Sequence, residues 1–175
     1  AINNGILELA KCGVIKRVSL LADSAYLGHG LDELKKIRGV ELGLHFNLTY
    51  GKAEAKPSAI LSQWLNPFLN KTLLREQVRS EFNSQMASLY KTGINVTYLD
   101  GHHHIHVVPG ILDSIADLMK HAGIKTVRCP YDSNLLLSTK FSIALLAAAS
   151  KNSIRRHGFN YMPFFYPRKK HFMDN

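Results

Sequence analysis

Hydrophobic and polar positions along the chain follow two periods, one typical of helices and one typical of strands. Short apolar runs rich in β-branched residues predict strands, and longer segments with apolar residues three and four positions apart predict helices. The stretch from Tyr50 to Lys71 follows neither period and contains Gly51, Pro57 and Pro67, so we expect an irregular excursion there. The predicted helices span residues 2–12, 24–37, 72–92, 111–121 and 140–157, and the predicted strands span residues 14–22, 40–48, 96–99 and 126–129.

This alternation of strands and helices predicts the fold class. Strands separated by helices of this length pair in parallel through right-handed crossovers, which indicates an α/β fold. A chain of 175 residues with 46% hydrophobic content suits a single domain over residues 1–175. No apolar run is long enough to span a bilayer, so we expect no membrane partner. The two cysteines, Cys12 and Cys129, lie far apart and form no CxxC pair, which favours a reduced cytoplasmic compartment.

The formal net charge of +9 raises nucleic acid as a partner. However, the basic residues are dispersed, and the two dense groups, Arg155 to His157 and Arg168 to His171, have no interleaved aromatic binding motif. We interpret them as a solvated helix end and a solvated tail, and we expect no nucleic-acid partner. The alternative, a basic interaction protein, would bind nucleic acid with an affinity that falls steeply as salt rises and ignores chelator.

The densest cluster of potential metal-binding side chains lies between Asp100 and His106, where an aspartate and four of the nine histidines fall within seven residues. Neutral imidazole is the commonest protein metal ligand, so the cluster predicts half of a metal site. If the preceding strand continues through it, His102, His104 and His106 share one face and His103 takes the other. Asp100 shares the first face and could hold an imidazole in one tautomer.

A second histidine, His45, ends the predicted strand 40–48. Active sites of parallel α/β folds gather at the carboxyl ends of strands, so His45 and His102 should meet at one mouth. A catalytic metal needs about three protein ligands, so a carboxylate is still required. The candidates are Asp23, Asp100, Asp132 and a residue before Ala1, although Asp23 and Asp132 are also typical of helix caps or turns. Asn47 should tie down the loop after its strand, and Trp64 is either a packing residue or an aromatic that stacks on a ligand ring.

Several stretches resemble the YdjC-like carbohydrate deacetylase family. Gly43 to Lys52 is similar to the first histidine motif of that family, and Thr97 to Ile111 is similar to the second. The stretch Asn4 to Ile15 resembles the family's first helix and following strand, and Ile124–Arg128 and Arg155–Gly158 sit where the family has related segments. The resemblance covers nearly the whole chain, and it implies that the parallel strands form an incomplete TIM-like (β/α) barrel.

The same resemblance implies a function and a set of site residues. His45 and His102 would be ligands of a divalent metal, Mg²⁺ or Zn²⁺, in a hydrolase that removes N-acetyl groups from an amino sugar or a chitooligosaccharide. The family's catalytic aspartate pair and its final histidine would lie before Ala1 and after Asn175, so that the catalytic residues fall outside this chain. His104 and His106 would contact substrate or support the ligands, and the protein would be a homodimer. The alternative is a catalytically incomplete module of the same fold that binds metal or sugar.

Overall fold

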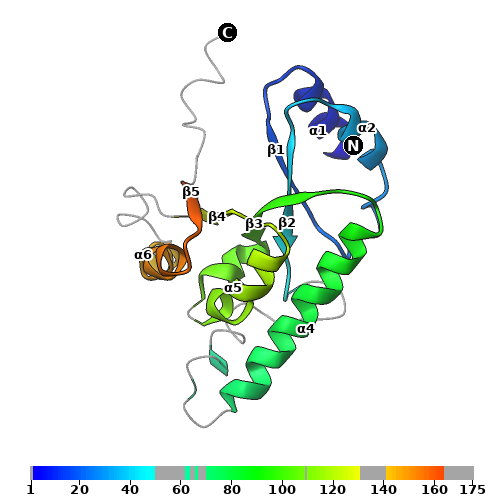
Figure 1. Ribbon diagram of the computed structural model, residues 1–175. Coiled ribbons are helices and arrows are strands. Elements are labelled where there is room, and N and C mark those ends of the chain that lie inside the picture. The colour runs from blue at the N-terminus through cyan, green and yellow to red at the C-terminus, as the bar shows by residue number, and fades with distance from the viewer. Residues whose placement is uncertain are drawn as a thin grey trace.

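The computed structural model describes residues 2–49, 62–63, 66, 70–108, 110–130 and 141–163. In these residues, five parallel strands form one sheet in which each strand lies beside its predecessor in sequence (Figure 1). The strands are β1 (Arg17–Leu20), β2 (Glu41–Phe46), β3 (Val96–Gly101), β4 (Thr126–Cys129) and β5 (Asn160–Pro163). The helices are α1 (Ile2–Lys11), α2 (Leu31–Lys36), α4 (Lys71–Tyr90), α5 (Ile111–His121) and α6 (Phe141–Arg156), with a 3₁₀ segment η2 (His102–Val107) after β3. The predicted α/β fold of parallel strands is confirmed.

The apolar face of the sheet packs against helices. Alternate residues of β2, namely Leu42, Leu44 and Phe46, are buried, and they belong to one core with apolar side chains of α4 and α5. The Phe46 and Phe82 rings meet edge to face with centroids 5.9 Å apart, which joins β2 to α4. Figure 1 shows α4, α5 and α6 along one side of the sheet, with α1 and α2 together beside β1 and β2.

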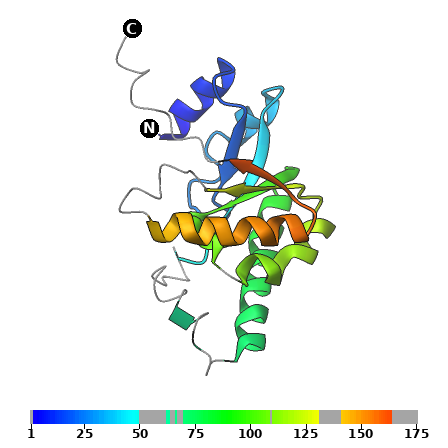
Figure 2. The ribbon, with the colours of Figure 1, turned by 90° about the vertical axis from the view of Figure 1, so that its left-hand side faces the viewer.

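The sheet is strongly curled. In a flat sheet, β1 and β5 would be about 19 Å apart, because neighbouring strands are spaced by about 4.8 Å. Instead, Arg17 Nη1 of β1 lies 3.1 Å from Met162 Sδ of β5, and Figure 2 shows these two strands approaching each other. The two edges therefore turn toward one another, as in an incomplete barrel, and the concave face is lined by residues that alternate with the apolar ones.

Helix bounds agree with the sequence pattern except for α2. Helix α5 and strand β4 have the predicted bounds, whereas α2 begins at Leu31 and not at residue 24. Gly30 precedes it with φ of 80°, a left-handed conformation that interrupts any longer helix. The carbonyls of Tyr26 and His29 accept hydrogen bonds from the Asn3 side chain, at 3.3 and 3.2 Å. Helix α1 thereby satisfies carbonyl groups that a longer α2 would have bonded within itself.

Strand β5 is absent from the sequence prediction, whereas the basic end of α6 that precedes it is exposed at Arg155 and Arg156, as predicted. The Arg156 side chain is 67% exposed, and Arg156 Nη2 and His157 Nε2 each also donate to Asp113 Oδ1 of α5 at 2.8 Å. The basic end of α6 is therefore tied to α5. These contacts orient the chain for its return to the sheet edge at β5.

Some predictions fall outside the described residues. Trp64, Asp132 and most of the irregular stretch from Tyr50 to Lys71 are among them. Within the part of the chain that the structure describes, none of the helices has the length and apolar character needed to cross a membrane.

Candidate metal and catalytic site

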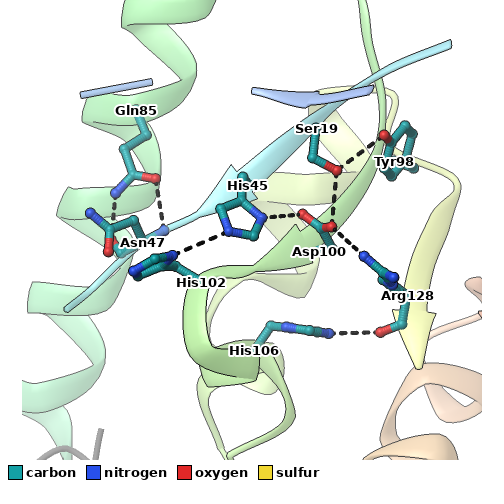
Figure 3. Close-up of polar contacts among 9 residues, drawn as sticks. All are labelled: Ser19, His45, Asn47, Gln85, Tyr98, Asp100, His102, His106 and Arg128. Atoms are coloured by element: carbon teal, nitrogen blue, oxygen red, sulfur yellow. Dashed lines mark hydrogen bonds and ion pairs between the residues drawn. The ribbon is translucent and has the colours of Figure 1, made fainter. Parts of the chain in front are cut away.

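The site begins with a pair of residues on neighbouring strands. His45 of β2 and Asp100 of β3 are register partners near the carboxyl ends of their strands. Paired residues of adjacent strands project to the same face, so the two side chains lie side by side. Asp100 Oδ1 accepts a hydrogen bond from His45 Nδ1 at 2.7 Å (Figure 3). This contact places the imidazole proton on Nδ1 and leaves a lone pair on Nε2.

Asp100 is only 3% exposed and gathers partners from three strands. Its Oδ2 atom accepts from Ser19 Oγ of β1 at 2.9 Å and from Arg128 Nη1 of β4 at 3.2 Å. Burial by itself raises the pKa of Asp100. The hydrogen bond from His45 and the neighbouring charges lower the pKa by more than burial raises it, so the pKa lies below its ordinary value. The carboxylate therefore stays ionised and holds β1, β2 and β4 around β3.

A glycine allows β1 to take part in this network. A Cβ atom at Gly43 would lie 2.4 Å from the Tyr98 ring, so only glycine lets the ring cross β2. The Tyr98 hydroxyl then lies 3.1 Å from Ser19 Oγ on β1. Burial raises the pKa of Tyr98, which keeps the hydroxyl protonated at neutral pH. Tyr98 and Ser19 thus form a polar support beneath Asp100.

His102 follows β3 directly and faces His45. Its Nδ1 atom lies 3.3 Å from His45 Nε2, and the two rings meet at an interplanar angle of 78° (Figure 3). Burial, followed by the nearby His103 and His45, lowers the pKa of His102, and the charge of Asp23 only partly opposes this. His102 is therefore neutral at physiological pH, the state in which an imidazole can bind a metal. The structure brings His45, Asp100 and His102 into one site.

The expected extended conformation beyond Gly101 is wrong. Residues His102 to Val107 form a 3₁₀ segment, in which His103 and His104 have left-handed φ of 50° and 57°. A single alternating face is then impossible, because each left-handed residue redirects the chain. His102 turns to His45, whereas His106 is 1% exposed and donates from Nε2 to the Arg128 carbonyl at 2.7 Å. The ring of His104 lies 6.5 Å from that of His106, and its contact with substrate stays a prediction.

Asn47 anchors the segment after β2. The peptide N–H of Asn47 donates to Gln85 Oε1 of α4 at 3.1 Å, and the side-chain amide of Gln85 donates to the backbone carbonyl of Asn47. The Asn47 side chain accepts from the Thr49 N–H at 2.9 Å and donates to Asp23 Oδ2 at 2.7 Å. Asp23 lies in a turn after β1 and caps no helix, since the cap of α2 is Gly30. Asn47 therefore holds the Asp23 carboxylate at the carboxyl end of the sheet.

The histidine pair has the spacing of two metal ligands. Two nitrogens bound to one tetrahedral Zn²⁺ at about 2.0–2.1 Å would be about 3.3 Å apart, and the observed Nε2 to Nδ1 distance is 3.3 Å. Without a cation, a hydrogen bond connects the two rings, with His102 Nδ1 as the donor and the lone pair of His45 Nε2 as the acceptor. Among the described residues, no group of three or more His, Cys, Asp or Glu side chains is arranged to hold a metal. The pair fits two positions of a metal site, and both oxygens of Asp100 are already engaged.

Burial of His106 should make the folded chain sensitive to acid. Burial lowers the pKa of His106 from 6.5 to about 4. On acidification the unfolded chain binds a proton first, so this contribution is present above pH 6.5 and is lost as the pH falls toward 4. We expect the free energy of unfolding to fall by about 3 kcal/mol across this window through His106 alone. Urea unfolding at a series of pH values measures the slope, and His106→Gln should flatten it. An equal slope in both proteins would contradict the assignment.

Four residues of the site escaped the sequence prediction, namely Ser19, Gln85, Tyr98 and Arg128. Gln85 had a detectable signal, because it is a polar residue on the apolar stripe of α4 and is 2% exposed. Arg128 and Ser19 lie in strands that were predicted from their apolar residues, and the polar positions of those strands gave no separate signal. Their roles depend on which residues the register places opposite Asp100.

Comparison with known proteins identifies related sequences. The model of the YdjC-like protein family matches residues 1–173 of the chain. A human carbohydrate deacetylase is 31% identical over 144 residues, which cover 74% of this chain and 44% of the relative. A mouse carbohydrate deacetylase is 30% identical over 142 residues, covering 73% and 46%. A chitooligosaccharide deacetylase of Salmonella schwarzengrund is 27% identical over 132 residues, covering 70% and 51%. The chain spans about half the length of these curated relatives.

A solved structure supports the architecture. A crystal structure of an Enterococcus faecalis protein, described as a candidate cellobiose-phosphate cleavage protein, matches with a TM-score of 0.57 at 19% identity. The match covers 87% of this chain and 59% of that one, and it is evidence for the fold alone. Together with the family match over residues 1–173, these findings show that the chain belongs to the YdjC-like protein family.

Proposed function

We propose that this chain carries part of the site of a metal-dependent deacetylase, which hydrolyses the N-acetyl group of an amino sugar or a chitooligosaccharide. The observation that carries the proposal is the pair of imidazole nitrogens, His45 Nε2 and His102 Nδ1, 3.3 Å apart at the carboxyl end of a parallel sheet. The names of the relatives, carbohydrate deacetylase and chitooligosaccharide deacetylase, support the substrate class.

The residues of the chain have separate tasks in this proposal. His45 and His102 would hold a divalent cation, which supplies a Lewis acid for the acetyl carbonyl and lowers the pKa of a bound water. Two imidazole ligands suit Zn²⁺ better than Mg²⁺, which prefers oxygen. Asp100 keeps the proton of His45 on Nδ1, so that Nε2 faces outward. Asn47 holds Asp23 beside this pair, where its carboxylate can meet polar groups of a sugar.

The overall reaction consumes water and yields acetate and a free amine. It therefore needs a base that takes a proton from water and an acid that protonates the leaving nitrogen. His45 and Asp100 are engaged with each other, and Asp100 is also bound by Ser19 and Arg128. We propose that these two tasks belong to other residues. The predicted homodimer and cytoplasmic location stay predictions.

The second candidate is a module that binds metal or sugar without catalysis. It is favoured by one observation: among the described residues, no group of three or more His, Cys, Asp or Glu side chains is arranged to hold a metal. The deacetylase and the metal-binding module would both bind the metal through His45 and His102, and only the deacetylase would turn over substrate.

Metal analysis and acetate release test the proposal together. The chain, and any longer protein that carries it, is treated with chelator, reloaded with Zn²⁺ or Mg²⁺, and measured for bound metal and for acetate released from N-acetylated chitooligosaccharides. Bound metal with chelator-sensitive acetate release supports the deacetylase. Bound metal without acetate release favours the binding module. Failure to retain any metal would refute the deacetylase and the metal-binding module, and would leave only a module that binds sugar.

A further inference from the structure

His106 is a fully buried polar side chain near the site, and the predicted metal pair does not use it. It is 1% exposed and ends a turn that passes through the left-handed residues His103 and His104. A Cβ atom at Gly101 would lie 2.5 Å from His106 Nδ1, so the ring packs directly on the backbone where β3 ends. The backbone is thus shaped to bring this ring back under the strand.

Among the described residues, the His106 ring makes one hydrogen bond, and its partner lies on β4. Its Nε2 atom lies 2.7 Å from the carbonyl oxygen of Arg128, whereas Nδ1 is buried without a hydrogen-bond partner among the described residues. The ring is neutral, since burial lowers its pKa to about 4, and a carbonyl can only accept. The proton therefore sits on Nε2, which donates to Arg128.

This bond replaces a contact of the sheet. The register of β3 with β4 ends at Leu99 and Val127, so the backbone of β3 does not extend alongside Arg128. At that level η2 turns away, and the His106 side chain supplies the donor (Figure 3). The Arg128 guanidinium in turn donates to Asp100 Oδ2 at 3.2 Å. Arg128 is therefore held at its carbonyl by His106 and reaches the site with its side chain.

A position needed only for packing would be filled at lower cost by leucine. Burying a polar ring that leaves one nitrogen without a hydrogen-bond partner costs free energy. The presence of histidine here therefore indicates that its remaining hydrogen bond has a role beyond packing. That bond lies on a continuous path, from His106 through Arg128 to Asp100 and then to His45.

We propose that His106 is a positioning residue of the metal site: by holding the carbonyl of Arg128, it directs the guanidinium to Asp100, which keeps Nε2 of His45 turned toward His102. The value of this arrangement for catalysis rests on the proposed function. The arrangement itself is a property of the chain without metal or substrate.

The test compares His106→Leu with His106→Gln in the full chain. Leucine removes the donor, whereas glutamine places an amide N–H close to where Nε2 stands. His121→Leu is the matched control, because His121 Nδ1 also contacts a backbone carbonyl, that of Asp117, at 2.7 Å and on an exposed helix. Histidine side-chain NMR of the metal-free chain reports the tautomer of His45, and a competing chelator dye reports the Zn²⁺ affinity.

We expect His106→Leu to convert His45 from the Nδ1–H form to a mixture of tautomers and to weaken Zn²⁺ binding about tenfold. His106→Gln should restore the tautomer, and His121→Leu should leave it unchanged. A folded His106→Leu chain with the parent tautomer would overturn the proposal. Should that variant not fold, Arg128→Met must produce the same mixture, and a parent tautomer there would equally overturn it. Absence of Zn²⁺ binding in the parent chain would refute the proposed function. The tautomer of His45 in the metal-free variants would still decide whether His106 is a positioning residue.

Discussion

His45→Ala is expected to weaken Zn²⁺ binding by more than about 100-fold, because loss of a mere orienting contact already costs about 10–100-fold. His102→Ala should have an effect of the same size, since the two nitrogens at 3.3 Å would serve one ion. The fold should survive both changes, because these side chains lie at the ends of strands and the His45 side chain is 29% exposed. Zn²⁺ titration against a chelator dye, with circular dichroism to verify folding, is the measurement.

A double variant sharpens this prediction. If one ion needs both imidazoles, the double substitution should cost little more than either single substitution, since the site is already lost. His121→Ala removes an exposed histidine remote from the pair and is the control for non-specific binding. Unchanged affinity in either single variant would remove that histidine from the metal site.

Asp100→Ala should be among the most destabilising single substitutions in the chain. It leaves Arg128, His45 and Ser19 without the carboxylate that accepts from all three. Breaking a buried ion pair by removing one partner costs about 3–5 kcal/mol. We expect about 3 kcal/mol here, at the lower end of that range, because the Arg128 side chain is 32% exposed and can regain water. Urea unfolding at pH 7 measures the change.

The control is a surface carboxylate in a comparable ion pair. Asp117 accepts from Arg79 at 2.6 and 2.9 Å, but its side chain is 54% exposed. Asp117→Ala should therefore cost only about 0–1 kcal/mol. Asp100→Asn separates charge from shape, because it keeps one acceptor oxygen and removes the negative charge. If Asp100→Ala costs no more than Asp117→Ala, the buried network does not stabilise the fold.

The arrangement of the elements was largely readable from the sequence. The period of apolar positions is a local property, and it suffices for α5 and β4, whose bounds match the prediction. Strand β5 escaped because four residues, Asn160–Pro163, carry no resolvable period and pair only with β4. The length of α2 escaped because Gly30 has a left-handed φ of 80° directly before Leu31, and the apolar period over residues 24–37 does not reveal this conformation.

For the site, the sequence by itself determined which residue types were available and that His45 and His102 lie at the carboxyl ends of two predicted strands. A parallel sheet brings such positions together, so their meeting follows from topology. The tertiary structure decided the rest. The left-handed His103 and His104 separate His102 from His106, and no periodic pattern reveals such a turn. The register placed Asp100 opposite His45, while the curl of the sheet and the glycine at position 43 brought Ser19, Tyr98 and Arg128 to it. These contacts join residues up to 81 positions apart, and they exist only once the strands have paired.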